Sequence, residues 1–339
     1  MWRVAIVGAA ALWGAVGCGT AEGGQIPDLG PPPARGPATH QLNPRLLRRF
    51  RALEAPRPEQ ADRIALGKML YFDPRLSANA DLSCNTCHPL DRAGADHLST
   101  SRGTAGQRGK RNAPTVYNAG AHLAQFWDGR APTLEEQAAG PILASNEMAM
   151  IEPRAVAQTL RRIPGYVTAF GRAFPGEPID LPHVGRALAA FERTLVTPSR
   201  WDRFLDGDHA SLTALEQRGL KLFADVGCIQ CHTGELVGGS MFQKAGVVDQ
   251  WPNQSDQGRF EITHDEADRM VFKVPSLRNV AQTAPYFHDG SIGTLRTAIA
   301  MMGRYQLGVE LLPEEVTLIE IWLTSLDGAP LHIEPPTLP

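Results

Sequence analysis

The chain has 339 residues, a length that favours two domains of ordinary size. Its hydrophobic content of 43% and charged content of 20% are typical of globular proteins. The formal net charge is only −3, so charge gives no reason to expect nucleic-acid binding. The 33 glycines and 27 prolines indicate many loops.

The N-terminus has the pattern of an export signal. Arg3 supplies a positive charge, and the uncharged apolar run Val4–Val16 is too short to span a bilayer comfortably. The run closes with Ala-Val-Gly before Cys18, which resembles a bacterial lipoprotein box. We therefore predict a lipid anchor at Cys18, with ordinary cleavage near Ala21 as the alternative. Either route places the protein in the periplasm, and the first route anchors it to the membrane as a lipoprotein.

The chain after the predicted signal peptide (1–17) begins with a linker and continues as helices. Residues 18–45 are rich in Gly and Pro and predict a flexible linker. Beyond it strand signals are few, so the fold class is predicted to be mainly α. Helices are predicted at 46–53, 60–70, 134–139, 155–162, 184–195, 214–223, 295–302 and 314–326.

Two short motifs share one pattern, Cys-x-x-Cys-His, at Cys84–His88 and Cys228–His232. This is the attachment signature of c-type haem. Two thiols at this spacing reach the two vinyl groups of one porphyrin, and the next residue supplies an axial nitrogen to the iron. Two zinc knuckles or two disulfides are the alternatives, but neither explains a His after each pair. We predict two covalently bound haem c groups, held by Cys84, Cys87, His88, Cys228, Cys231 and His232.

The segments that follow the two motifs also match each other. When Pro114 is aligned with Pro275, identical residues recur without a gap, including Phe-x-Asp-Gly followed by Thr-Leu. This block predicts a tight turn that leads into a helix capped near the Thr. We infer two cytochrome c-like haem domains related by internal duplication, at 46–200 and 201–339.

One difference between the two copies separates the two irons. Met302 aligns with Pro141. Methionine is a common sixth ligand of c-type haem iron, whereas proline has no side-chain atom that can bind iron. The second haem is therefore expected to have His232 and Met302 as axial ligands and to transfer electrons, with Met301 as the rival ligand. The first haem is expected to have His88 on one side and an open site for chemistry on the other.

Other residues of the first copy suit catalysis. Trp127 aligns with His288, and a Trp between two haem domains can relay electrons. Gln137, Pro141 and Glu147 follow and are expected to line one cavity above the first iron. A carboxylate there can move a proton between the two oxygens of peroxide. The alternative for Glu147 is a solvated surface acid.

These residues together resemble the bacterial diheme cytochrome c peroxidases and their relative MauG, the diheme enzyme that matures tryptophan tryptophylquinone. The resemblance runs from about residue 65 to 326. Besides the two haem motifs it rests on 66–68, 72–77, 111–115, 124–130, 147–148, 275–279, 285–290 and 302–308.

The resemblance implies an activity and its partners. Hydrogen peroxide would react at the iron above His88, with Glu147 as the acid–base residue and Gln137 nearby. Electrons from a small periplasmic donor, a cytochrome c or a cupredoxin, would enter at the second haem and cross through Trp127. The family is often homodimeric. It also carries a calcium ion between the domains, whose ligands map onto the Asn112 side chain and the carbonyls of Thr283 and Pro285.

Two comparisons within the family bear on the activity. MauG-like proteins have a Tyr as distal ligand of the second haem, whereas this chain has Met302. Many family peroxidases carry a capping His where this chain has Thr104, and the substitute His97 lies seven residues earlier. We therefore predict an uncapped first haem that needs no reductive activation, which leaves room for a MauG-like oxidase acting on a partner protein. The third interpretation is a plain diheme electron carrier. It needs His97 or His122 to bind the first iron, because Pro141 cannot.

Overall fold

The computed structural model describes residues 42–54, 56 and 60–339. The predicted signal peptide, Cys18 and most of the predicted linker lie outside these residues. Within the described ranges, no helix is long and apolar enough to cross a membrane. The described chain is mostly helical and contains a two-stranded antiparallel sheet. The prediction of a mainly α fold is confirmed.

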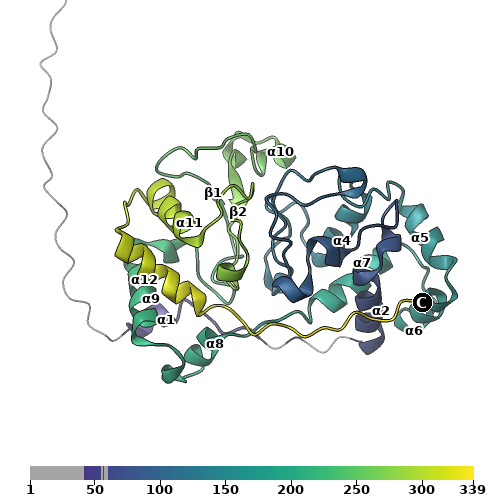
Figure 1. Cartoon of the computed structure of the whole chain (residues 1–339), viewed down its shortest axis with the longest axis horizontal. Helices are drawn as coiled ribbons and strands as arrows, with labels where there is room; N and C mark the ends of the chain where they lie inside the picture. Colours follow the sequence, from purple (N-terminus) through teal and green to yellow (C-terminus); the bar gives the residue numbers. More distant parts are fainter. Residues whose placement is uncertain (1–41, 55, 57–59) are drawn as a thin grey trace, which may run out of the picture. The chain divides into compact units, whose positions relative to one another are not determined.

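The longer helices form two groups (Figure 1). The first group contains α2 (Ala61–Phe72), α4 (Leu134–Leu143), α5 (Pro153–Arg161), α6 (Pro164–Ala173) and α7 (Leu181–Glu192). The second contains α1 (Pro44–Leu47), α8 (Arg200–Leu205), α9 (Ala214–Val226), α11 (Leu295–Met301) and α12 (Pro313–Thr324). The remaining elements are α3 (Cys84–Cys87), α10 (Phe260–Thr263), β1 (Phe242–Lys244) and β2 (Val271–Lys273), with β1 and β2 paired.

Each haem motif follows a helix that crosses a later helix at a glycine. In α2, a Cβ on Gly67 would lie 1.9 Å from the carbonyl oxygen of Ala187 in α7. In α9, a Cβ on Gly219 would lie 2.0 Å from the carbonyl oxygen of Leu318 in α12. No side chain fits at either position, because the two backbones approach too closely. The helix before each motif is thereby fixed against its own half of the chain.

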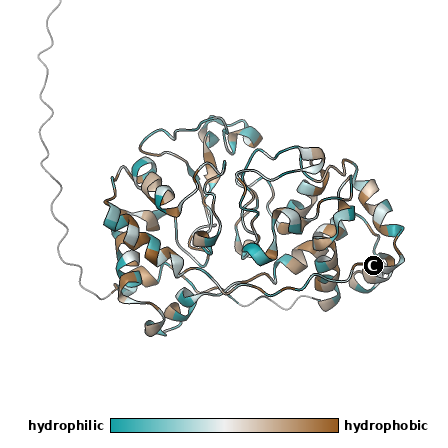
Figure 2. Ribbon diagram, in the orientation of Figure 1, coloured by the Kyte–Doolittle hydropathy of each residue, from teal (hydrophilic) through white to brown (hydrophobic). Residues whose placement is uncertain are grey.

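The buried apolar side chains form two main clusters. One cluster includes Leu66, Ile142 and Leu188 from α2, α4 and α7. The other includes Trp201 and Trp322, which are both fully buried. Figure 2 shows apolar residues in brown on the packed helices of both groups. The extended C-terminal segment leaves α12 and runs to the first group (Figure 1), where its apolar side chains pack against the first cluster.

The two aligned segments have the same backbone conformation. Asn118 and Asn279 have φ angles of 61° and 58°, and Phe126 and Phe287 have φ angles of 64° and 70°. Positive φ is uncommon for a residue with a side chain, so its recurrence at aligned positions is specific. Helices α4 and α11 then begin after a threonine N-cap whose side chain accepts a backbone N–H.

Several helices differ in extent from the sequence prediction. The predicted helix at 46–53 is the shorter α1, and α4 runs four residues past 139 with Pro141 in its last turn. Pro141 has no N–H to donate to the Gln137 carbonyl, so the last turn of α4 lacks that hydrogen bond. Helix α6 was missed, because its sequence begins Pro164-Gly165 and contains a second glycine, which lowers helix propensity. Burial of its apolar face against the first cluster outweighs that propensity.

Candidate haem-binding sites

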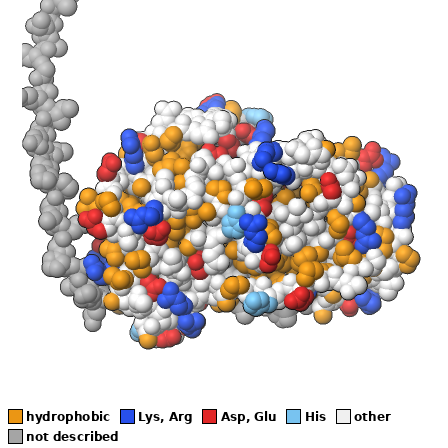
Figure 3. Space-filling model, viewed as in Figure 1, with side chains coloured by type: hydrophobic (Ala, Val, Ile, Leu, Met, Phe, Trp, Pro, Cys, Tyr) orange, Lys and Arg blue, Asp and Glu red, His pale blue; other side chains and the backbone are white. Residues whose placement is uncertain are grey.

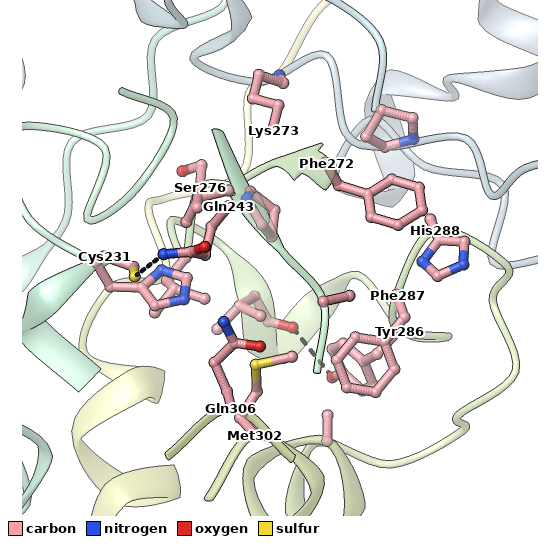
Figure 4. A pocket seen from close by; sticks show the side chains of 18 of the residues that line it. Cys231, Gln243, Phe272, Lys273, Ser276, Tyr286, Phe287, His288, Met302 and Gln306 are labelled. Atoms are coloured by element: carbon pink, nitrogen blue, oxygen red, sulfur yellow. Dashed lines mark hydrogen bonds between the residues drawn. The ribbon is translucent and has the colours of Figure 1, made fainter. Parts of the chain in front are cut away.

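The second motif opens onto a cavity of about 250 Å³. Cys228, Cys231 and His232 line it, as does Met302, and most of the other lining side chains are apolar. Figure 4 shows Cys231 and Met302 facing the same space from different elements. An apolar cavity with two thiols, an imidazole and a thioether fits a covalently attached porphyrin with two axial ligands. The described cysteines form no disulfide.

His232 is oriented as an iron ligand requires. Its Nδ1 lies 3.1 Å from the carbonyl oxygen of Val237, which leaves Nε2 for the cavity. Burial lowers the pKa of His232 to about 4, so the ring is neutral. Gly238 has a φ of +137°, and a Cβ there would lie 2.1 Å from the carbonyl oxygen of Pro275 and 3.2 Å from His232 Nδ1. The loop beside the imidazole therefore requires glycine at 238.

Met302 begins a π-helical turn, Met302–Gln306, that directly follows α11. Such turns are often found at functional sites. Gln306 fixes the turn, since its Nε2 donates to the Lys244 carbonyl at 2.9 Å and its Oε1 accepts from the Gly246 N–H at 3.1 Å. Met302 is among the cavity-lining residues, and Met301 is not. The geometry thus favours Met302 over its neighbour.

The first motif lies in the short helix α3. Ser83 and Thr86 form a capping box around it, and the Tyr71 hydroxyl donates to the His88 carbonyl at 2.6 Å. Burial, together with the charges of Asp96 and Glu147, raises the pKa of the Cys87 thiol to about 11. The Nδ1 of His88 is buried and has no hydrogen-bond partner among the described residues. Burial also lowers the pKa of His88, so this ring is neutral as well.

Gln137, Pro141 and Glu147 come together at the end of α4. Gln137 and Pro141 are one turn apart and share a face of the helix. The chain then folds back, because the Met148 N–H donates to the Pro141 carbonyl at 3.1 Å and the Glu147 N–H donates to the Ala144 carbonyl at 3.0 Å. The Glu147 side chain is therefore held beside the last turn of α4.

Glu147 is half-buried, which disfavours the reading of a solvated surface acid. Burial raises its pKa, and the charge of Arg130 opposes that rise. The charge of Glu147 in turn helps to raise the pKa of the Cys87 thiol, so the carboxylate lies within electrostatic reach of the first motif. Arg130 itself stacks over the ring of Phe126, with 3.4 Å from its guanidinium carbon to the ring centroid.

The loop after the first motif packs against the Glu147 segment. Thr104 is buried, its N–H donates to the Glu147 carbonyl at 2.8 Å, and its hydroxyl donates to Asp81 at 2.7 Å. His97 belongs to the same loop, with Nδ1 at 2.9 Å from the Ala284 carbonyl and Nε2 at 3.3 Å from the Arg92 carbonyl. Both of its ring nitrogens are thus directed at backbone oxygens.

Trp127 contacts both halves of the chain. Its Nε1 donates to the Asn112 carbonyl at 2.9 Å, and its ring lies edge-on to His288 with 6.5 Å between centroids. His288 stacks on Phe272 at 4.2 Å. Because Trp127, His288 and Phe272 all line the second cavity, a series of aromatic contacts runs along its wall. Figure 4 shows the neighbouring His288 and Phe272 of this series.

The three residues predicted to bind calcium line this cavity too. They are Asn112, Thr283 and Pro285. Asn112 donates from Nδ2 to the Leu98 carbonyl at 2.9 Å, which leaves its side-chain oxygen as the atom for a cation. No group of three or more His, Cys, Asp or Glu side chains in the described part of the chain could hold a metal ion. A site made of an amide and carbonyls is of another kind, so calcium binding stays a prediction.

Sequence reasoning missed two features of these sites. Tyr71 holds the backbone of the first motif, although nothing in the sequence marks it. Lys273 lies in the cavity wall and hydrogen-bonds His122, which the sequence suggested only as an alternative iron ligand. A lysine within the apolar stretch Val-Phe-Lys-Val was the available signal.

Two Cys-x-x-Cys-His motifs on a helical fold define a diheme c-type cytochrome. The family model described as di-haem cytochrome c peroxidase matches residues 61–210. The cytochrome c551 peroxidase of Pseudomonas aeruginosa is 47% identical over 306 residues, which cover 85% of this chain and 88% of the relative. That of Nitrosomonas europaea is 46% identical over 289 residues, covering 85% and 86%.

A solved structure supports the same assignment. The crystal structure of a MauG-like protein associated with microbial copper homeostasis superposes with a TM-score of 0.71 at 30% identity, and covers 81% of this chain and 93% of that one. The chain belongs to the di-haem cytochrome c peroxidase and MauG family. It is accordingly an oxidoreductase of the peroxidase class.

Proposed function

We propose that this protein reduces hydrogen peroxide to water at the first haem, with electrons that a small periplasmic donor such as a cytochrome c or a cupredoxin delivers to the second. The observation that carries the proposal is the pairing of Pro141 with Met302. Both follow a threonine-capped helix start at the same helical position, but only Met302 offers a ligand atom. The side of the first haem beyond Pro141 is thus free for peroxide, where Glu147 is held.

The chain's own residues would manage the protons and the path of the electrons. Bound haem would supply the iron and the reducing equivalents. Glu147 would accept a proton from one peroxide oxygen and return it to the other as the O–O bond breaks. The Gln137 amide, on the same helix face as Pro141, would orient the peroxide by hydrogen bonding. Trp127 would carry electrons between the halves through its contacts with the wall of the second cavity.

We further propose the organisation that this function requires. Two haem domains, 46–200 and 201–339, would derive from one duplicated unit, which the two core clusters and the matching φ angles support. The proposal also includes export to the periplasm with lipidation at Cys18. It further includes a calcium ion at Asn112, Thr283 and Pro285, and a homodimer. On the face in Figure 3, acidic, basic and apolar side chains are interspersed, so no patch of like charge marks a docking site for the donor on that face.

Peroxide turnover by Glu147→Gln tests the catalytic assignment. Loss of the carboxylate should lower kcat by about 10²–10⁴-fold, the usual contribution of a positioned acid–base group. Glu152→Gln is the matched control, because Glu152 is exposed and pairs only with the exposed Arg154. Both variants should keep two haems per chain. Unchanged turnover in Glu147→Gln would remove Glu147 from the mechanism.

Electron paramagnetic resonance of the fully oxidised protein tests the open site. A high-spin ferric signal that disappears on addition of peroxide is expected, because Thr104 replaces a capping His and both His97 nitrogens face carbonyls. Two low-spin signals that do not respond to peroxide would contradict an open site and favour a plain electron carrier.

The second candidate is a MauG-like oxidase that uses peroxide to modify a partner protein. Thr104 favours it, because an uncapped first haem needs no activation by a donor. Incubation with peroxide and candidate secreted proteins, followed by mass spectrometry, separates the two functions. A peroxidase consumes reduced donor and leaves the proteins unaltered, whereas the oxidase adds or removes mass at specific residues.

A further inference from the structure

A buried lysine lies in the wall of the second cavity. Lys273 ends β2, its side chain is only 6% exposed, and its Nζ hydrogen-bonds Nδ1 of His122. Its backbone N–H donates to the Trp127 carbonyl at 2.7 Å, which fixes the strand end against the first half of the chain. Both Lys273 and His122 line the cavity. The position of the ammonium group is therefore set by the fold, and Lys273 is not a mobile surface lysine.

The charges around the cavity are unbalanced. Among the described residues that line it, Lys244, Lys273 and Arg278 are cationic and none is Asp or Glu. Lys244 is exposed to solvent. Arg278 is neutralised by Asp202, with two hydrogen bonds of 2.6 and 2.8 Å. Among the cations that line the cavity, Lys273 is thus the buried one without a carboxylate partner.

Burial of that cation is unfavourable in the protein alone. Desolvation lowers the pKa of Lys273 to about 7. Desolvation, together with the charge of Lys273, holds the pKa of His122 well below its usual value, so the imidazole is a neutral partner. Buried charges in proteins are normally paired, and an unpaired one costs several kcal/mol. The missing anion is expected to arrive with whatever occupies the cavity.

We propose that Lys273, supported by His122, binds a propionate carboxylate of the second haem. A haem c presents two carboxylates on the porphyrin edge that carries no thioether bonds. Figure 4 shows Lys273 at the opposite end of the view from Met302, with Cys231 to one side at an intermediate height. The inference rests on the proposed function only in requiring a haem in the second cavity, not in requiring peroxide turnover.

The lysine has a consequence for the second iron. A fixed positive charge at the porphyrin edge disfavours the ferric state, which carries one more positive charge than the ferrous state. Lys273 should therefore raise the potential of the second haem, in the same direction as the Met302 ligand. Lys273 and Met302 together would help the second haem to accept electrons from a donor.

The test is the midpoint potential of the second haem in holoprotein carrying Lys273→Met, measured by spectroelectrochemical titration at pH 7. The equilibrium constant for reduction should fall about tenfold, which is about 59 mV for one electron. Lys273→Arg should restore most of the wild-type potential, because it keeps the charge. Lys244→Met is the matched control, since this exposed lysine lines the same cavity and water screens its charge.

A second readout separates contact with a propionate from a general field effect. The propionate bending band in the resonance Raman spectrum should shift in Lys273→Met and not in Lys244→Met. An unchanged midpoint potential with an unshifted band, in a variant that retains both haems and a low-spin second haem, would overturn the proposal. A lowered potential with an unshifted band would also overturn it, because the lysine would then act without touching the carboxylate. Neither readout depends on whether the protein reduces peroxide.

Discussion

The segments that follow the two haem motifs have matching backbones, but the residues around the two imidazoles differ. The Nδ1 of His232 lies 3.1 Å from the Val237 carbonyl, whereas the Nδ1 of buried His88 has no hydrogen-bond partner among the described residues. Met302 lines the cavity of the second motif, and the aligned position in the first half is Pro141. The comparison teaches that two segments with the same backbone conformation can differ in the single side chain that could bind iron.

Two buried acids lie in opposite environments. Asp202 is 5% exposed, and although burial works to raise its pKa, the Arg278 guanidinium and backbone N–H groups hold it below its usual value. Burial raises the pKa of Glu192, at the end of α7 in the first half, to about 8 despite the charge of Arg193. Asp202 is thus paired with a cation, whereas Glu192 prefers to be protonated.

The opposite pKa shifts give opposite responses to pH. The Asp202 pKa is depressed by folding, so its stabilisation is present above the unfolded pKa and is lost as pH falls through the folded one. The Glu192 pKa is raised, so stability is full below the unfolded value and is lost as pH rises from about 4.5 to about 8. Asp202 therefore loses its stabilisation towards acid pH, and Glu192 loses its stabilisation between about pH 4.5 and pH 8.

The largest effect is expected from Arg278→Met. The change leaves Asp202 buried without its cation and should lower the free energy of unfolding by about 3–5 kcal/mol. Denaturant unfolding of the holoprotein at pH 7 measures it. The double variant Asp202→Asn with Arg278→Met should regain part of the loss, because no unpaired charge remains. A double variant as unstable as the single one would show that packing and not charge dominates at Arg278.

Pro141→Met should convert the first site toward the second. A thioether at the position that matches Met302 can bind the first iron, so the high-spin signal should disappear and peroxide turnover should fall at least 100-fold, or about 2.7 kcal/mol. Pro141→Ala is the matched control, since it removes the proline without adding a ligand. Retention of the high-spin signal in Pro141→Met would show that the two helix ends are not equivalent.

Glu192→Gln should remove the loss of stability between about pH 4.5 and pH 8. Between pH 5 and pH 9, the free energy of unfolding of the variant relative to wild type should rise by about 2 kcal/mol. This rise is smaller than the full pKa shift implies, because water penetration relieves part of the burial penalty. The measurement is the difference in free energy of unfolding between variant and wild type at the two pH values. Parallel pH profiles would mean that Glu192 does not titrate in the folded protein.

Met302→Ala should lower the midpoint potential of the second haem, because loss of the thioether removes an axial ligand that raises that potential. The low-spin signal of that haem should change as well. Met301→Ala is the control, because Met301 does not line the cavity. The reverse outcome would make Met301 the ligand.

Much of the fold follows from local sequence. The apolar periodicity placed α2, α5, α9 and α12 within a few residues, because an amphipathic stripe is a local property. Helix α6 escaped, since its stability comes from burial against the first cluster and not from propensity. The true end of α4 also escaped, because Pro141 lowers the helix propensity of its last turn.

The sequence by itself predicted where two haems attach and which half offers a methionine, and it determined which family the chain joins, because these depend on residue types at fixed spacing. Only the tertiary structure decided how Glu147 is held at the end of α4, where the His97 nitrogens point, and that Lys273 meets His122 in a cavity whose described lining has no acids. Two of these contacts, His97 with Ala284 and Lys273 with His122, join residues more than a hundred positions apart. Their burial and charge balance are set by packing, which residue spacing does not encode.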